Sequence, residues 1–171
     1  ADFRKRFLNE GRLIAKLSHP NIVTVHDIGV WGNIHYLSMT YVPGGTLGDK
    51  IRDGLKPDLA LGILKRLADA LGYAHSQGIV HRDIKPGNVL FAHSGAPVLT
   101  DFGIAKTIGS ETHLTSTGMA VGSAEYMSPE QAGGNEIDNR SDLYALGVLF
   151  WEMLTGALPY SAANPVALAF K

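Results

Sequence analysis

Two short apolar runs on either side of a turn, within residues 81–103, constrain this sequence more than any other feature. Residues 89–91 (VLF) and 98–99 (VL) flank the segment 93–97 (HSGAP). β-forming residues separated by Gly and Pro are typical of a β-hairpin. A hairpin brings the residue before its first strand close to the residue after its second strand. Asn88 and Asp101 are therefore expected to meet at its open end.

Polar side chains suited to phosphate chemistry surround this end of the hairpin. The amide of Asn88 and the carboxylate of Asp101 offer oxygen ligands of the kind that Mg²⁺ prefers. Asp83 lies five residues before Asn88, with Lys85 between them. A carboxylate that orients a hydroxyl, an ammonium group that offsets phosphate charge, and two metal ligands form a set suited to phosphoryl transfer, which depends on positioning and charge stabilisation.

These residues carry a family resemblance. Residues 81–88 (HRDIKPGN) resemble the catalytic loop of protein kinases, and residues 101–103 (DFG) resemble their metal-binding motif. The resemblance implies that Asp83 and Lys85 are catalytic and that Asn88 and Asp101 hold Mg²⁺ or Mn²⁺. ATP is the cofactor that it implies.

The resemblance also implies an α+β, protein-kinase-like fold. Residues 1–42 correspond to the remainder of the N-lobe, with its αC helix, last strands and hinge, and residues 43–171 to an incomplete, mainly helical C-lobe. The glycine-rich loop, the lysine-bearing strand and the C-terminal helices of the family have no counterpart in these 171 residues. We therefore expect a fragment of a kinase domain with little or no activity by itself.

A helix is expected over residues 1–17. Apolar residues at spacings of three or four form one face, which also includes Glu10. By resemblance, Glu10 is the residue that pairs with the lysine holding the ATP phosphates. The alternative is that Glu10 lies at the edge of this face and is solvated, as most Glu side chains are.

The ATP-binding hinge is expected to follow two strands, over residues 22–30 and 34–42. The resemblance makes Met39 the gatekeeper and Thr40, Tyr41 and Val42 the hinge, and it adds Leu90 as a further ATP-binding residue. An ordinary buried strand is an equally good interpretation of the Met39 segment.

His81 and Phe102 are given structural roles by the resemblance. His81 packs beneath Phe102, and both join Ile14 and Val25 in an apolar spine. The alternative is that His81 acts as a base, because it lies two residues before Asp83.

Two long helices are expected over residues 57–77 and 139–155. The second is apolar on nearly every side, which is typical of a buried helix. Asp142 near its start resembles the kinase aspartate that holds the catalytic-loop backbone, and an Asp there is also favoured by the helix dipole. Residues 128–130 (SPE) resemble the motif that closes the kinase activation segment. Its structural residue, Glu130, is expected to lack its usual Arg partner in this chain.

The glycine- and hydroxyl-rich residues 104–128 match the activation segment. Arg82 precedes Asp83, and kinases with this Arg are commonly switched by phosphorylation of that segment. Thr115 and Thr117 are the candidate phosphosites, and inert loop hydroxyls are the alternative. Ser123 and Lys85 occupy positions that favour Ser/Thr over Tyr substrates.

Composition excludes several other classes. The 171 residues carry a net charge of −1 and no Cys, which gives no electrostatic case for nucleic acid and no thiolate chemistry. No apolar run is long enough to cross a bilayer. We therefore expect a cytoplasmic segment without membrane contact, although the full-length protein could be membrane-anchored through other regions.

The predicted function is a bacterial, receptor-like Ser/Thr protein kinase. Its partners are protein substrates with Ser or Thr residues, and a kinase dimer could serve autophosphorylation in trans. One alternative is a non-catalytic pseudokinase or scaffold. The other is a small-molecule phosphotransferase of the antibiotic-kinase type, which would lack the hydroxyl-rich activation segment.

Overall fold

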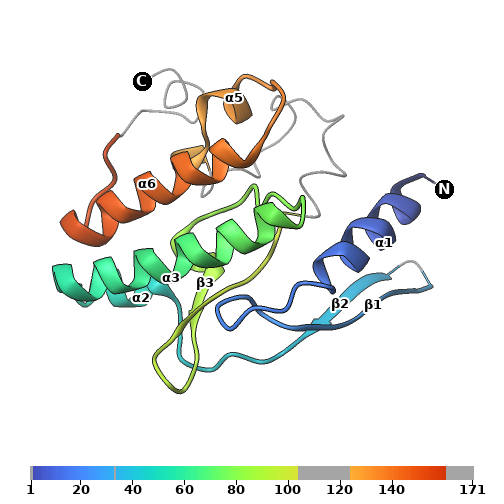
Figure 1. Ribbon diagram of the computed structural model, residues 1–171, viewed down its shortest axis with the longest axis horizontal. Helices are drawn as coiled ribbons and strands as arrows, with labels where there is room; N and C mark the ends of the chain where they lie inside the picture. The colour runs from blue at the N-terminus through green and yellow to red at the C-terminus, as the bar shows by residue number, and fades with distance from the viewer. Residues whose placement is uncertain (1, 33, 104–123, 161–171) are drawn as a thin grey trace.

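The computed structural model describes residues 2–32, 34–103 and 124–160, and its elements form two groups (Figure 1). The first group comprises α1 (Asp2–Ile14), β1 (Val25–Trp31) and β2 (Ile34–Met39). The second group comprises α2 (Leu47–Arg52), α3 (Pro57–Ser76), η1 (Pro86–Asn88), β3 (Val89–Phe91), β4 (Pro97–Leu99), η2 (Ala124–Tyr126), α5 (Pro129–Ala132) and α6 (Asn139–Thr155). The α+β class and both long helices agree with the sequence prediction.

Helix α1 packs on the antiparallel hairpin formed by β1 and β2. Gly11 lies at the contact, where a Cβ atom would come within 1.6 Å of the Ile28 Cδ1 atom. The helix ends at Ile14, three residues before the predicted end, because the chain tightens into a turn in which the Leu17 N–H donates to the Ile14 carbonyl. Leu17 is still buried, so the apolar face continues beyond the helix.

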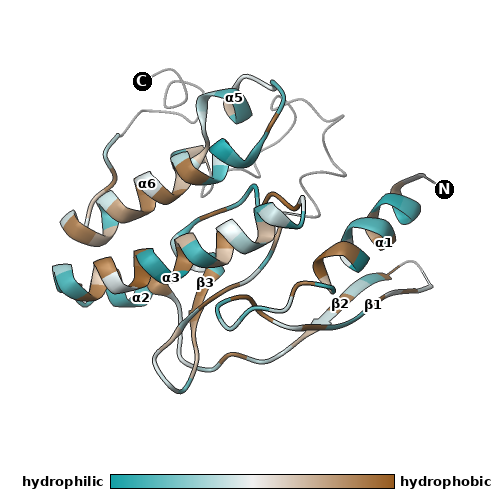
Figure 2. Ribbon diagram, viewed as in Figure 1, coloured by the Kyte–Doolittle hydropathy of each residue, from teal (hydrophilic) through white to brown (hydrophobic). Residues whose placement is uncertain are grey.

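Helices α3 and α6 pack side by side and form the centre of the second group (Figures 1 and 2). α3 begins with Pro57, which suits a first helical position because it needs no N–H partner there. α6 is capped by the Asp138 side chain and ends at Gly156, whose φ of 73° is easily adopted by glycine. Residues that are almost fully buried in this region include Ile63, Leu67, Leu71, Leu149 and Met153.

The expectation that α6 is a buried helix is wrong for one of its faces. Leu143 and Trp151 are 53% and 52% exposed, respectively. The physical reason is that α3 covers one face of α6, and in the described part of the chain no other element covers these two side chains.

The predicted hairpin in the second group consists of β3 and β4, with Val89 opposite Leu99. Its two edges are both extended by short backbone pairings. On one side, the Val23 N–H donates to the Leu99 carbonyl over 2.9 Å. On the other side, the Gly44 N–H donates to the Phe91 carbonyl over 2.8 Å. The hairpin therefore joins the N-terminal group to the helices.

Gly44 is required by this approach of two backbones. A Cβ atom at this position would lie 2.3 Å from the Phe91 carbonyl oxygen. Since that neighbour is backbone and cannot rotate away, only glycine allows the pairing.

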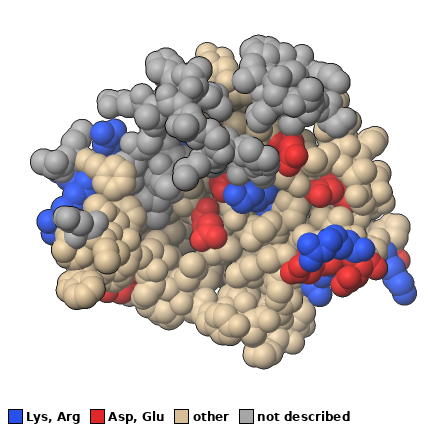
Figure 3. Space-filling model, turned by 180° about the vertical axis from the view of Figure 1, so that it is seen from behind, with Lys and Arg blue, Asp and Glu red and all other residues tan. Residues whose placement is uncertain are grey.

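The surface carries charges of both signs. On the face shown in Figure 3, basic and acidic side chains are mixed rather than gathered into a field of one sign. Among the described residues, no helix is long and apolar enough to cross a membrane.

Leu149 provides a test of the packing between α3 and α6. Leu149→Ala is expected to lower the free energy of unfolding by about 2–5 kcal/mol, because the side chain is 0% exposed and its loss leaves a cavity. Leu143→Ala, on the exposed side of the same helix, is the control and should change stability by less than about 0.5 kcal/mol. Urea unfolding measures both, and equal effects would contradict the packing described.

Candidate active site

The backbone of the loop that precedes η1, residues 81–85, is held by Asp142 in the first turn of α6. The Asp142 side chain is 1% exposed. Its Oδ2 atom accepts from the His81 N–H and its Oδ1 atom accepts from the Arg82 N–H, each over 2.8 Å. The His75 Nε2 atom lies 2.8 Å from Oδ2. A buried carboxylate with these three contacts is well compensated for its lost hydration.

The backbone of the site is strained at two non-glycine residues. Arg82 has a φ of 68° and Asp101 a φ of 58°. Left-handed backbone is costly for residues with a Cβ atom and persists where the surroundings fix it. For Arg82, the hydrogen bond of its N–H group to Asp142 supplies part of that fixation.

The His81 ring joins the loop to the end of the hairpin. Its Nδ1 atom accepts from the Asp83 N–H over 3.2 Å, so the proton of the neutral ring is assigned to Nε2, which donates to the Thr100 carbonyl over 3.0 Å. The ring also packs on Phe102 at a centroid distance of 4.5 Å. Burial lowers the pKa of His81, against the opposing charge of Asp142, and keeps the ring neutral. A ring enclosed in this way is suited to a structural role.

The Asp83 carboxylate is oriented by its own loop. Its Oδ2 atom lies 2.9 Å from the Lys85 Nζ atom and accepts from the Asn88 Nδ2 atom over 3.0 Å. Asn88 Nδ2 also donates to the Asp83 carbonyl over 2.7 Å. These contacts turn the amide oxygen of Asn88 away from Asp83.

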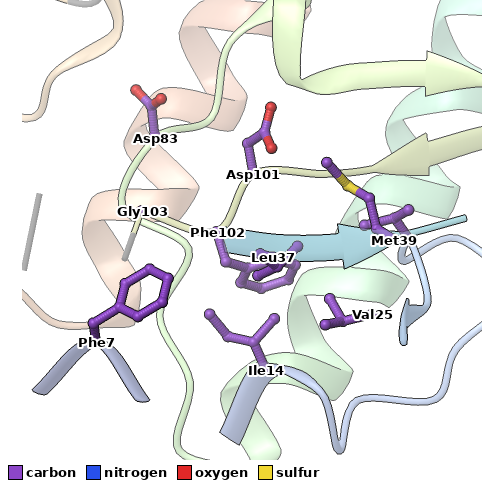
Figure 4. A pocket seen from close by; sticks show the side chains of 10 residues that line it. Phe7, Ile14, Val25, Leu37, Met39, Asp83, Asp101, Phe102 and Gly103 are labelled. Atoms are coloured by element: carbon purple, nitrogen blue, oxygen red, sulfur yellow. The ribbon is translucent and has the colours of Figure 1, made fainter. Parts of the chain in front are cut away.

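Asp83 and Asp101 line the same pocket, which has a volume of about 410 Å³. In Figure 4 both carboxyl groups point to the same side, away from the apolar side chains. The apolar wall includes Ile14, Val25 and Phe102, which come from three separate segments. These three residues of the expected spine therefore line one pocket, and the fourth, His81, packs on Phe102.

Three of the residues expected to contact ATP, Met39, Thr40 and Tyr41, lie at the end of β2 and just beyond it. Met39 is 40% exposed, lines the pocket and accepts a hydrogen bond at its Sδ atom from Thr100 Oγ1 over 3.4 Å. The Thr40 N–H donates to the Thr24 carbonyl, and Tyr41 is 86% exposed.

The other two residues expected to bind ATP, Val42 and Leu90, are half-buried, and so is Glu10 on α1.

Glu130 is held by α6. The Ser141 hydroxyl donates to its carboxylate, and this bond lowers the Glu130 pKa. Sequence reasoning had considered only an arginine as partner. Thr115, Thr117 and Ser123 lie outside the described residues.

Sequence reasoning missed the contacts that Gln131 and Thr100 make with the loop. Gln131 donates to the Arg82 carbonyl over 3.0 Å. The sequence does contain a capping-box signal here, because Ser128 is followed three residues later by Gln. No sequence signal indicates that the Thr100 carbonyl meets His81.

The side-chain oxygen atoms of Asn88 and Asp101 fit a magnesium ion that is bound together with phosphates. No group of three or more His, Cys, Asp or Glu side chains that could hold a metal occurs in the described part of the chain. Mg²⁺ typically takes one or two carboxylates and completes its shell with water and substrate phosphates. An amide oxygen from Asn88 and a carboxylate from Asp101 are sufficient protein ligands for that arrangement.

Comparisons with known proteins identify the family of this chain. The family model described as "Protein kinase domain" matches residues 1–169. A probable serine/threonine-protein kinase of Clostridium perfringens is 46% identical over 169 residues, which are 98% of this chain and 24% of that protein. The serine/threonine-protein kinase PrkC of Bacillus subtilis is 43% identical over 172 residues, which are 99% of this chain and 26% of that protein.

A solved structure extends the similarity to the fold. The PknI kinase domain of Mycobacterium tuberculosis superposes with a TM-score of 0.75 at 32% identity, covering 96% of this chain and 62% of that one. The family model and the fold comparison therefore agree. The chain belongs to the protein kinase family, and it spans about a quarter of the length of the curated relatives it matches.

His81 gives the site a pH-dependent stability. Its pKa is lowered in the folded state from an ordinary value of 6.5, so the unfolded chain binds a proton that the folded chain excludes. Stability is therefore expected to fall as pH drops below about 6.5, with a slope from this group of at most about 1.4 kcal/mol per pH unit.

His81→Gln, which can still donate and accept but does not titrate, should lose this part of the slope. Urea unfolding between about pH 5 and pH 7.5 measures the difference. Identical slopes in the two proteins would show that His81 is not buried as a neutral ring.

Proposed function

We propose that this chain is part of the catalytic domain of a serine/threonine protein kinase. The observation that carries the proposal is the cluster of Asp83, Lys85 and Asn88 on one loop, with Asp101 at the same pocket. Membership of the protein kinase family and the names of its relatives support it. The reaction moves the γ-phosphoryl group of ATP to a Ser or Thr hydroxyl of a protein substrate.

Each residue has a role that follows from its chemistry. Asp83 accepts a hydrogen bond from the substrate hydroxyl, orients it and takes its proton as the new P–O bond forms. The bond to ADP breaks at the same phosphorus, and Lys85 stabilises the charge on the transferring group. When bound, Mg²⁺ offsets phosphate charge, and Asn88 and Asp101 would hold it.

Nucleotide binding and regulation by phosphorylation are the remaining parts of the proposal. The hinge segment of Thr40, Tyr41 and Val42, together with Met39 and Leu90, would receive the adenine of ATP, and Glu10 would organise the phosphate-binding lysine. Phosphorylation within residues 104–123 would add negative charge that pairs well with an arginine such as Arg82.

Substitution of Asp83 tests the assignment in the full-length kinase. Asp83→Asn is expected to lower phosphoryl transfer to protein by about 10²–10⁴-fold, because the general base is lost. Binding of ATP with Mg²⁺ should change little, since an amide still accepts from Asn88. Asp58→Asn, on the exposed surface of α3, is the control. Retained transfer in the Asp83 variant would overturn the role of this residue, and absence of transfer in the wild type would favour a scaffold.

The 171 residues by themselves are expected to show little or no ATP turnover. The alignment with the solved kinase domain pairs them with only 62% of that chain, so over a third of that domain has no counterpart here. A turnover assay on the 171-residue chain measures this, and rates equal to those of the full-length kinase would contradict the expectation.

A further inference from the structure

The peptide group between Arg82 and Asp83 is held on both sides. Its carbonyl oxygen accepts from the Gln131 Nε2 atom over 3.0 Å. Its N–H donates to the His81 Nδ1 atom over 3.2 Å. Because a peptide group is planar and rigid, these two contacts fix the direction in which the chain enters Asp83.

This fixation acts where the backbone would otherwise relax. Arg82 has a φ of 68°, and its own N–H is held by Asp142. Asp142 lies on α6 and Gln131 lies on α5, so two different helices hold the two ends of one strained residue. Removal of either contact would let Arg82 move toward ordinary backbone angles and rotate the peptide group that carries Asp83.

Gln131 has a second contact, which shows why an amide is needed. The side-chain Oε1 atom of Gln131 accepts from the Ser128 N–H over 3.0 Å. The backbone N–H of Gln131 donates to Ser128 Oγ over 3.4 Å, and the two bonds form the capping box of α5. A glutamate would serve this cap equally well. Only the amide adds a donor for the Arg82 carbonyl, and these two contacts also fix which end of the amide is nitrogen.

We propose that Gln131 is a positioning residue that sets the direction of the Asp83 carboxylate through the Arg82 carbonyl. It thereby couples the turn that begins at Ser128, the last part of the segment matching the activation segment, to the loop that carries out the transfer. The inference rests on the proposed kinase function. Gln131 itself contacts neither the nucleotide nor the substrate in this scheme, and its effect passes through the backbone of Arg82.

Two variants of the full-length kinase separate the loop contact from the cap. Gln131→Glu keeps the acceptor for the Ser128 N–H but places a carboxylate oxygen against the Arg82 carbonyl. Ser128→Ala removes the hydroxyl of the cap but keeps the N–H that Gln131 accepts from, and with it the contact to Arg82. Gln131→Glu is expected to lower kcat by about 10- to 100-fold with little change in KM for ATP, as misplacement of a reacting group does. Ser128→Ala should lower thermal stability and change kcat by less than about threefold.

The pH profile adds a readout that loss of stability alone would not give. Protonation turns the introduced carboxyl group into a hydrogen-bond donor. The difference in kcat between the wild type and the Gln131→Glu variant should therefore become smaller as pH falls from about 8 to about 5. A constant deficit across this range, or a kcat equal to that of the wild type, would overturn the proposal.

Hydrogen exchange separates this inference from the kinase assignment. In Gln131→Glu the Asp83 amide should lose protection, and in Ser128→Ala it should keep it, whether or not the protein phosphorylates a substrate. If the Asp83 amide loses protection in Gln131→Glu but the wild-type protein phosphorylates no substrate, the positioning contact is supported and the proposed kinase function is contradicted. Unchanged protection in Gln131→Glu would overturn the positioning role.

Discussion

The buried carboxylate of Asp142 is the contact on which the rest of the site depends. It receives the N–H groups of His81 and Arg82 together with the ring of His75, and so it joins α6, α3 and the loop at one point. Three partners on one carboxylate compensate the cost of burying its charge, and they leave the strained Arg82 no easy way to relax. The loop is therefore part of the helical core and not a surface turn.

From this anchor, hydrogen bonds pass to the second half of the site. The neutral ring of His81 accepts a hydrogen bond from the Asp83 N–H at Nδ1. At Nε2 it donates one to the carbonyl of Thr100, the residue directly before Asp101. The carboxylate that would act on a hydroxyl and the carboxylate that would hold a metal are thus linked through one imidazole. This link requires a neutral ring, which its complete burial favours.

The apolar pocket beneath these carboxylates brings the N-terminal group into the site. Ile14 from α1 and Val25 from β1 meet Phe102 there, while Asp83 and Asp101 point to the other side (Figure 4). The position of α1 is fixed by its close approach to β1 at Gly11. Movement of α1 would open this wall and change the packing of the residue that follows Asp101, so the two groups of elements are coupled by packing as well as by hydrogen bonds.

The sequence alone determined the family, the two long helices, the hairpin and the identity of the polar residues at its open end, because these depend on local periodicity, turn chemistry and short motifs. Only the tertiary structure decided which distant groups satisfy the loop. Contacts such as that of Gln131 with Arg82, or of Ser141 with Glu130, join residues whose proximity no local pattern encodes. The exposed side of α6 was mispredicted for the same reason: hydrophobicity shows what a helix can bury, and its neighbours decide what it does bury.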